Sequence, residues 1–212
     1  MIESSMDISQ QSIRDSRFKI AGWLSICLGI LEIPLFISSL VFRSDPFLKP
    51  LFLFLFLIFT PLIFFRWIGT VYVLIQFRRL LNERYDFFKA DVIITLQIII
   101  SIIIGVKDIL MAYIEALFPL SDVAGTLGLV LYIFSLLVGG AIGIFLGARL
   151  LAIREDSYGS LRTWAIITII ASSCFVSIIL TPIGLALYLL NGIILGVIFL
   201  KAAEAEAQVD FV

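Results

Sequence analysis

The sequence predicts an all-α integral membrane protein: a polytopic helix bundle of six transmembrane helices with both termini in the cytoplasm. Three observations lead to this fold class. Of the 212 residues, 61% are apolar and 15% are charged, whereas a globular domain averages about 45–50% apolar and about 25% charged residues. Several apolar runs have the length that crosses a bilayer. Finally, the positive charges gather in alternate loops, which indicates one orientation in the membrane.

Six spans are expected, over residues 20–42, 51–77, 92–118, 124–148, 163–180 and 183–200. The fifth and sixth are separated only by LTPIG, which must form a tight hairpin because residues 163–200 are too many to cross once. The first run is too long for the apolar region of a cleavable signal peptide, so it is expected to stay in the membrane. The expected organisation is a cytoplasmic tail (1–19), one six-span domain (20–200) and a second cytoplasmic tail (201–212).

The distribution of Lys and Arg predicts the orientation. Eleven of the fifteen lie in the two tails and in the loops after the second and fourth spans, while Arg43 and Lys49 lie on the opposite side. Arg66 and Lys107 lie within spans. Because positively charged loops stay on the cytoplasmic side, both termini are expected there. We expect the lipid bilayer to be a bacterial cytoplasmic (inner) membrane.

Several classes of function find no support in the sequence. Histidine is absent, so this chain alone builds no His-ligated haem, His-based metal site or histidine general base. Cys27 and Cys174 lie in apolar runs and are expected to be packing residues. There is no phosphate-binding glycine loop or nucleophile elbow, and no basic patch interleaved with aromatic residues. We therefore predict no catalytic residue, no metal, no cofactor and no nucleic-acid partner.

Small residues recur at helical spacing in the fourth and sixth spans and form two ridges. The ridges consist of Ser135, Gly139, Gly143 and Gly147, and of Gly184, Gly192 and Gly196. In lipid, small residues let helix backbones approach closely. Close packing within the bundle is one interpretation. The other is that a ridge docks a membrane-protein partner or a second copy of the chain.

Polar residues inside the spans form a candidate intramembrane site. They are Glu32, Arg66, Gln97, Ser101, Lys107, Asp108 and Asn191. At 1.5 Å per residue, Glu32 and Arg66 lie about 20 Å and about 18 Å from the inner ends of their helices. An ion pair between them would neutralise two charges that are costly in a membrane.

The third span carries a polar stripe, because Gln97, Ser101, Asp108 and Glu115 fall at steps of four and seven. Lys107 lies beside the stripe, and its side chain should lean toward the bilayer centre. A stripe that faces the interior of the bundle explains these residues best. Since Lys107 and Asp108 are adjacent, each is expected to meet a different helix.

Two alternatives concern the lengths of the second and third spans. The second span could break at Thr60–Pro61 and end near Arg66, with Trp67 in the interfacial aromatic belt. The third span could end near Val106, leaving residues 107–118 as an amphipathic helix on the outer surface.

The sequence favours a non-enzymatic helix-packing subunit or scaffold of a membrane complex, because ridges are present and catalytic constellations are not. The first alternative is a small-solute or ion permease or channel that uses the charged residues of the spans. The second is an intramembrane lipid-modifying enzyme acting through carboxylates. A water-accessible cavity that reaches Glu32 and Arg66 would favour transport, whereas a dry, packed centre would favour the subunit.

Overall fold

The computed structural model describes residues 16–34, 49–117, 122–153 and 160–209, and this part of the chain is all-α. Six helices cover residues 16–34, α2 (Lys49–Tyr85), α3 (Asp91–Leu117), α4 (Asp122–Leu150), α5 (Ser160–Val176) and α6 (Thr181–Val209). One 3-10 turn, η2 (Phe88–Ala90), joins α2 to α3. The predicted all-α class and the number of helices are therefore confirmed.

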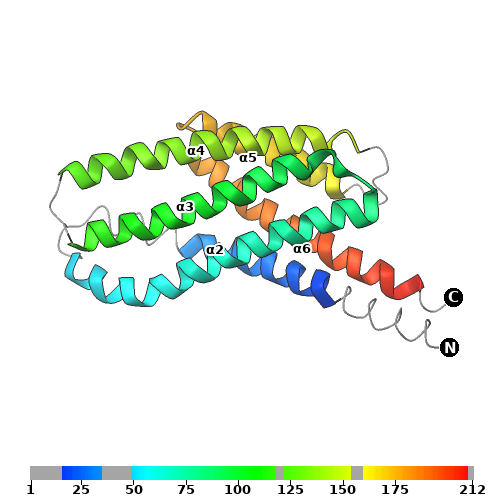
Figure 1. Ribbon diagram of the computed structural model, residues 1–212, viewed down its shortest axis with the longest axis horizontal. Coiled ribbons are helices and arrows are strands. Elements are labelled where there is room, and N and C mark those ends of the chain that lie inside the picture. Colours follow the sequence, from blue (N-terminus) through cyan, green and yellow to red (C-terminus); the bar gives the residue numbers. More distant parts are fainter. Residues whose placement is uncertain (1–15, 35–48, 118–121, 154–159, 210–212) are drawn as a thin grey trace.

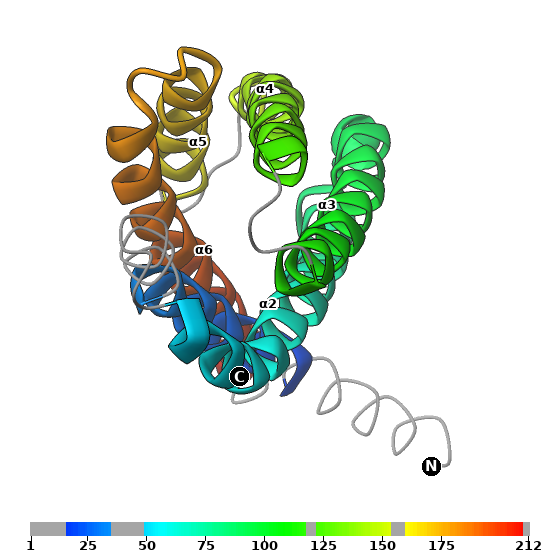
Figure 2. The same ribbon diagram turned by 90° about the vertical axis from the view of Figure 1, so that its left-hand side faces the viewer.

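The six helices form a ring in chain order. Consecutive helices from α2 to α6 pack against one another, and the helix over residues 16–34 closes the ring by contacting both α2 and α6. Figure 2 looks at the bundle from the left-hand end of Figure 1 and shows the helices in this order around the ring. The first turn of helix 16–34 and the last turn of α6 lie on the right of Figure 1. We call this the terminal end of the bundle.

Three helical segments of the described residues are long and apolar enough to cross a membrane. They are Phe88–Leu110, Thr126–Leu150 and Thr181–Ala205. The prediction of six such spans is therefore confirmed for three. Of the other helices, α5 has only 17 residues, and helix 16–34 contains Arg17, Lys19 and Glu32.

Both predicted interruptions are absent from the described helices. α2 continues through Pro61, and α3 continues past Lys107 to Leu117. The indole of Trp67 lies on α3, where a Cβ added to Gly105 would approach Trp67 Cδ1 to 2.6 Å. Its Nε1 is buried without a hydrogen-bond partner in the described structure. The Trp67 ring therefore packs against Gly105 of α3, and its place in an interfacial aromatic belt stays a prediction.

α5 is shorter than its two neighbours in the ring, α4 and α6. At 1.5 Å per residue, the 17 residues of α5 extend about 25 Å, and the 29 residues of α4 about 43 Å. α6 begins at Thr181–Pro182, where proline suits the first turn because no helical acceptor faces its nitrogen. In Figure 1 the turn between α5 and α6 stops well short of the far ends of α3 and α4. On this side of the ring, the described helices therefore extend less far from the terminal end.

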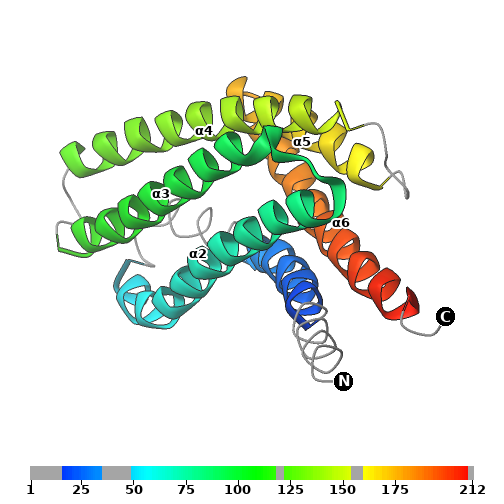
Figure 3. The same ribbon diagram turned by 45° about the vertical axis from the view of Figure 1, so that its right-hand side comes forward.

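The hydrophobic core lies at the terminal end. Phe77 and Phe199 are fully buried there, and their ring centroids are 6.4 Å apart. Trp164 completes the cluster, with its centroid 4.9 Å from that of Phe77. α2, α5 and α6 each supply one of the three rings, so the core ties these helices together where they converge. Figure 3 shows α6 running obliquely to α4 toward this end.

Polar side chains also connect the helices at the terminal end. Arg78 Nη2 donates to Asp91 Oδ2 over 2.9 Å, and Asn82 Nδ2 donates to Asp91 Oδ1 over 3.0 Å. As an acidic residue in the first turn of α3, Asp91 also interacts favourably with the helix dipole. Arg84 Nη1 donates to the backbone oxygen of Ala202 over 2.9 Å, which joins α2 to α6.

Candidate functional site

A cavity of about 390 Å³ lies in the centre of the ring, and all six helices contribute to its wall. This volume is within the range of about 300–1,000 Å³ that is typical of small-molecule sites. All seven residues of the candidate polar site predicted from the sequence line it: Glu32, Arg66, Gln97, Ser101, Lys107, Asp108 and Asn191. Residues distant in sequence thus reach one space, because each helix turns a polar position toward the axis of the ring.

The predicted ion pair between Glu32 and Arg66 is present. Arg66 Nε donates to Glu32 Oε1, which links helix 16–34 to α2. The Arg66 side chain keeps 38% of its surface exposed and that of Glu32 keeps 15%. The guanidinium is therefore only partly covered by its partner and contributes free surface to the cavity wall. Thr70 Oγ1 donates to the backbone oxygen of Arg66 over 2.8 Å, one helical turn away.

Lys107 and Asp108 form a second ion pair, with Nζ and Oδ1 2.7 Å apart. The expectation that each would meet a different helix was wrong for Asp108, because the long Lys107 side chain bends far enough to reach its neighbour. Lys107 also donates to Ser135 Oγ on α4 over 3.4 Å. Both residues are thus held at the cavity, as the polar stripe predicted. The Glu115 side chain lies outside the described residues.

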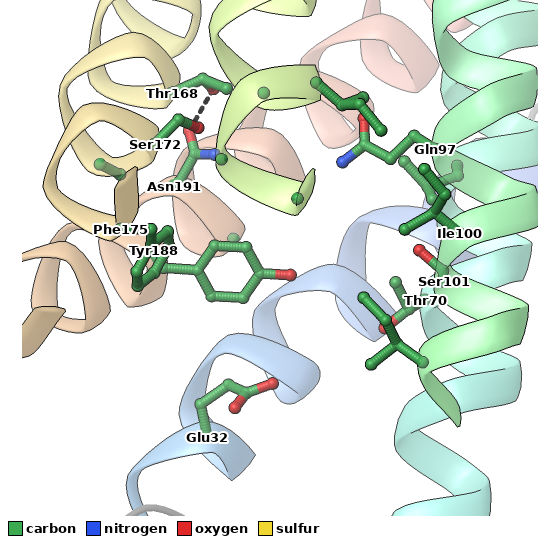
Figure 4. Close-up of a pocket in the computed structure, with 18 of the residues that line it drawn as sticks. Glu32, Thr70, Gln97, Ile100, Ser101, Thr168, Ser172, Phe175, Tyr188 and Asn191 are labelled. Carbon is green, nitrogen blue, oxygen red and sulfur yellow. Dashed lines mark hydrogen bonds between the residues drawn. The ribbon is translucent and has the colours of Figure 1, made fainter. Parts of the chain in front are cut away.

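Uncharged polar groups line the part of the cavity next to the core. Asn191 is 7% exposed, and its Oδ1 accepts a hydrogen bond from Thr168 Oγ1 over 3.1 Å. Trp164 Nε1 donates to the backbone oxygen of Asn191 over 3.1 Å. Figure 4 shows the Asn191 side chain directed across the cavity toward Gln97 of α3. Gln97 Oε1 is buried and has no hydrogen-bond partner in the described structure.

Several polar residues of this wall were not predicted from the sequence. They are Thr70, Tyr132, Thr168, Ser172 and Tyr188. In Figure 4 the hydroxyl of Tyr188 points into the open centre, between Glu32 and Ser101. Helical spacing carried a signal for these residues, since Tyr188 precedes Asn191 by three positions and Thr168 precedes Ser172 by four.

The hydrophobic core closes the cavity at the terminal end. Leu146, Trp164 and Leu195 belong both to the core cluster and to the lining of the cavity. The charged pairs lie farther from this core than the amide group of Asn191. In helix 16–34, Glu32 comes after the buried residues, and in α3, Asp108 lies well beyond them. The polar groups of the site therefore divide into charges on one side and amides and hydroxyls on the other, within a wall that also contains many apolar residues.

The predicted glycine ridges lie mostly against helices of the same chain. A Cβ added to Gly143 would lie 2.1 Å from Ser172 Oγ of α5, and one added to Gly147 would lie 2.8 Å from the backbone oxygen of Ala165. Gly184 lies against Cys174 and Phe175 of α5, while Gly192 and Gly196 lie against Gly29, Gly22 and Ile26 of helix 16–34. A Cβ added to Gly139 would meet no atom of another helix within 4 Å, and Gly139, like Ser135, lines the cavity.

Ser25 stabilises the contact between helix 16–34 and α6, because its Oγ donates to the backbone oxygen of Gly192 over 2.8 Å.

Within the described residues, no group of three or more Cys, Asp or Glu side chains is arranged to hold a metal ion. Compared with known proteins, the chain matches no family model, no curated protein sequence and no solved structure.

Proposed function

We propose that this chain is a six-span protein of the cytoplasmic membrane that binds a small solute in its central cavity, as a permease or channel. The observation that carries the proposal is the cavity of about 390 Å³ whose wall includes the Glu32–Arg66 pair. Ionisable residues inside a membrane protein generally face the bundle interior or a water-filled space and mark ligand pathways. A closely packed centre would have left no room for a solute.

The arrangement of the helices supports six spans. α3, α4 and α6 contain the three segments long and apolar enough to cross a membrane. α5 packs between α4 and α6, and helix 16–34 and α2 occupy the ring between α6 and α3. A ring in which α3, α4 and α6 cross the bilayer carries with it the helices that lie between them. The positive charges of the tails and of the second and fourth loops then favour a cytoplasmic terminal end.

The position of the core supports access from the extracytoplasmic side. Phe77, Trp164 and Phe199 fill the terminal end, so the cavity is closed toward the proposed cytoplasmic side. Lys107 and Asp108 lie away from this core, and Asp108 keeps 36% of its side-chain surface exposed. Transport to the cytoplasm would require the packed end to open in a second conformation.

The alternative function, a subunit that docks a partner through its glycine ridges, has less support. Gly143 and Gly147 of α4 and Gly196 of α6 are within contact distance of helices of the same chain. They explain close packing inside the bundle and leave less of either ridge to bind another protein.

Cysteine labelling tests the proposed function. After replacement of Cys27 and Cys174 by alanine, Ser101→Cys places one thiol in the cavity wall. A membrane-impermeant methanethiosulfonate added outside intact cells should modify this thiol, because water in the cavity allows it to ionise. Ile103→Cys is the matched control on the same helix, since Ile103 is 59% exposed on the outer surface of the bundle and would face lipid.

The proposal predicts rapid modification at position 101 and little at position 103. An unreactive thiol at position 101, in a protein whose thiol is detected after denaturation, would mean that the cavity is closed to water from outside. The proposed solute access would then be wrong.

A further inference from the structure

The charges on the cavity wall balance. Among the described residues that line the cavity, two are cationic, Arg66 and Lys107, and two are anionic, Glu32 and Asp108. Each cation contacts one anion. A ligand with a net charge would therefore bring an uncompensated charge into a cavity that apolar helices surround, which is unfavourable. A neutral ligand that carries one charge of each sign would keep the balance.

The ion pairs leave hydrogen-bonding capacity on both partners. Arg66 uses Nε for Glu32, and within the described part of the chain its two terminal nitrogens have no hydrogen-bond partner. These nitrogens form the edge of the guanidinium that binds carboxylates through two parallel hydrogen bonds. Glu32 and Asp108 each use one carboxylate oxygen in their ion pairs. Their second oxygens can accept hydrogen bonds from an ammonium group.

The inner part of the cavity requires an uncharged polar group. Gln97 Oε1 is buried without a partner in the described structure, and leaving such an acceptor unsatisfied is unfavourable. A ligand N–H or O–H that reached Gln97 would satisfy it. The Asn191 side chain faces Gln97 from the opposite wall (Figure 4). An uncharged donor and acceptor on the ligand would bridge these two amides.

We propose that the cavity binds a small, net-neutral zwitterion, with its anionic group on Arg66, its ammonium group at Glu32 and Asp108, and an uncharged polar part between Asn191 and Gln97. This inference rests on the proposed function and names the substrate class of the same site. Free amino acids have this chemistry, and so does the phosphoethanolamine headgroup of a phospholipid. The experiment therefore includes both sources.

The first arm measures binding of soluble zwitterions by isothermal titration calorimetry. The protein is placed in nanodiscs of phosphatidylglycerol, and each neutral amino acid that carries a polar side chain is titrated, with L-glutamine as the first probe. N-acetyl-L-glutamine, a monoanion, and L-glutaminamide, a monocation, are the matched controls. We expect the zwitterion to bind at least tenfold more tightly than either derivative. Equal or tighter binding of a derivative would overturn the proposal.

The second arm tests the lipid source with the Ser101→Cys protein. If the headgroup occupies the site, nanodiscs of phosphatidylethanolamine should slow modification of this thiol at least tenfold relative to phosphatidylglycerol. If modification is slowed and no free amino acid binds, the zwitterion in the cavity is the lipid headgroup. Neither binding nor slowing would overturn the proposal.

Two variants test whether the zwitterion binds at Arg66. Arg66→Gln should weaken binding of the zwitterion at least tenfold, because it removes the cation that holds the anionic group. Arg78→Gln is the matched control, since Arg78 pairs with Asp91 at the terminal end and is outside the cavity lining. An equal loss in both variants would contradict the assignment to Arg66.

Thiol accessibility distinguishes the two proposals. A reactive thiol at position 101 without any zwitterion binding would leave the solute cavity in place and overturn only its substrate class. An unreactive thiol in phosphatidylglycerol would instead overturn the proposed function.

Discussion

Arg66 of α2 donates from Nε to the carboxylate of Glu32 on the helix over residues 16–34, and both side chains line the central cavity. The two residues are 34 positions apart, so the pair fixes how two consecutive helices sit against each other. Removal of either partner leaves the other as an unpaired charge among apolar neighbours. The pair therefore contributes to the shape of the cavity as well as to its charge.

A double-mutant cycle should detect this pair. Glu32→Gln and Arg66→Gln should each lower Tm, and the double variant should lose less than the sum of the two losses. We expect a coupling of about 1–2 kcal/mol, below the ~3–5 kcal/mol that follows the breaking of a fully buried pair, because Arg66 is 38% exposed. Thermal shifts of the four proteins in one detergent measure the coupling. Strictly additive shifts would show that the pair does not contribute to stability.

The polar positions could be predicted from the sequence, because charge inside an apolar run is rare and helical spacing is regular. Glu32 and Arg66 could be paired from their depths alone, since both lie at a predictable distance from a polar loop. The Lys107–Asp108 contact could not be predicted, because it depends on the bend of one long side chain. Tyr188 and Thr168 were missed since tyrosine and threonine are common in lipid-facing helices, and only the ring of six helices shows that they face inward.

The length of the apolar segments was the weaker part of the prediction. α5 ends at Val176 because the chain turns at Ser177, where Oγ accepts a hydrogen bond from the Leu180 amide over 3.2 Å. The predicted fifth span extended to residue 180, because Ile178, Ile179 and Leu180 are as apolar as the residues inside a membrane-spanning helix. A side-chain cap of this kind ends a helix without any change in hydropathy.

The ridge on α4 provides a matched pair of substitutions. In Gly147→Ala the added methyl group would lie 2.8 Å from the backbone oxygen of Ala165, and this oxygen cannot rotate away. Overpacking typically costs about 1–3 kcal/mol, so Tm should fall. Gly139→Ala should leave Tm unchanged or raise it, since nothing lies within 4 Å of the added atom. A fall of equal size in both variants, measured by thermal shift, would contradict the packing of α4 on α5.

The orientation of the chain can be tested with reporter fusions. The positive charges and the common end of the two termini predict that alkaline phosphatase fused after Val212 will be inactive and that a fluorescent protein fused there will be bright. The same result is expected for fusions before Met1. A fusion after residue 120, between α3 and α4, should show the opposite activities. An active phosphatase at either terminus would rule out the proposed topology.

The turn between α5 and α6 contains a strained residue. Ile178 has φ 59°, and this left-handed region costs a residue with a Cβ about 1–2 kcal/mol. Ile178→Gly should relieve the strain and raise Tm by a few degrees, although the added freedom of glycine in the unfolded chain offsets about 0.5–1 kcal/mol. Ile179→Gly is the control, because Ile179 is 88% exposed and does not have a positive φ. Its Tm should not rise, and an equal gain in both variants would count against strain at position 178.

The aromatic cluster at the terminal end should control both stability and access to the cavity. Phe77 is fully buried between the rings of Trp164 and Phe199, so Phe77→Ala leaves a void beneath the cavity floor. Loss of such a ring typically costs about 3–5 kcal/mol, and we expect Tm to fall by about 6–20 °C. Phe65→Ala on the same helix should change Tm little, because Phe65 is 50% exposed.

Phe77→Ala also tests whether the aromatic cluster closes the cavity or only stabilises the bundle. In inside-out vesicles, an impermeant reagent meets the terminal end first, and the intact cluster should protect Ser101→Cys from it. Combining Phe77→Ala with Ser101→Cys should increase the modification rate in these vesicles at least tenfold, because the void connects the cavity to the cytoplasmic side. The Phe65→Ala combination should label as slowly as Ser101→Cys alone. If Phe77→Ala lowers Tm yet labelling stays slow, the cluster stabilises the bundle but does not close the cavity.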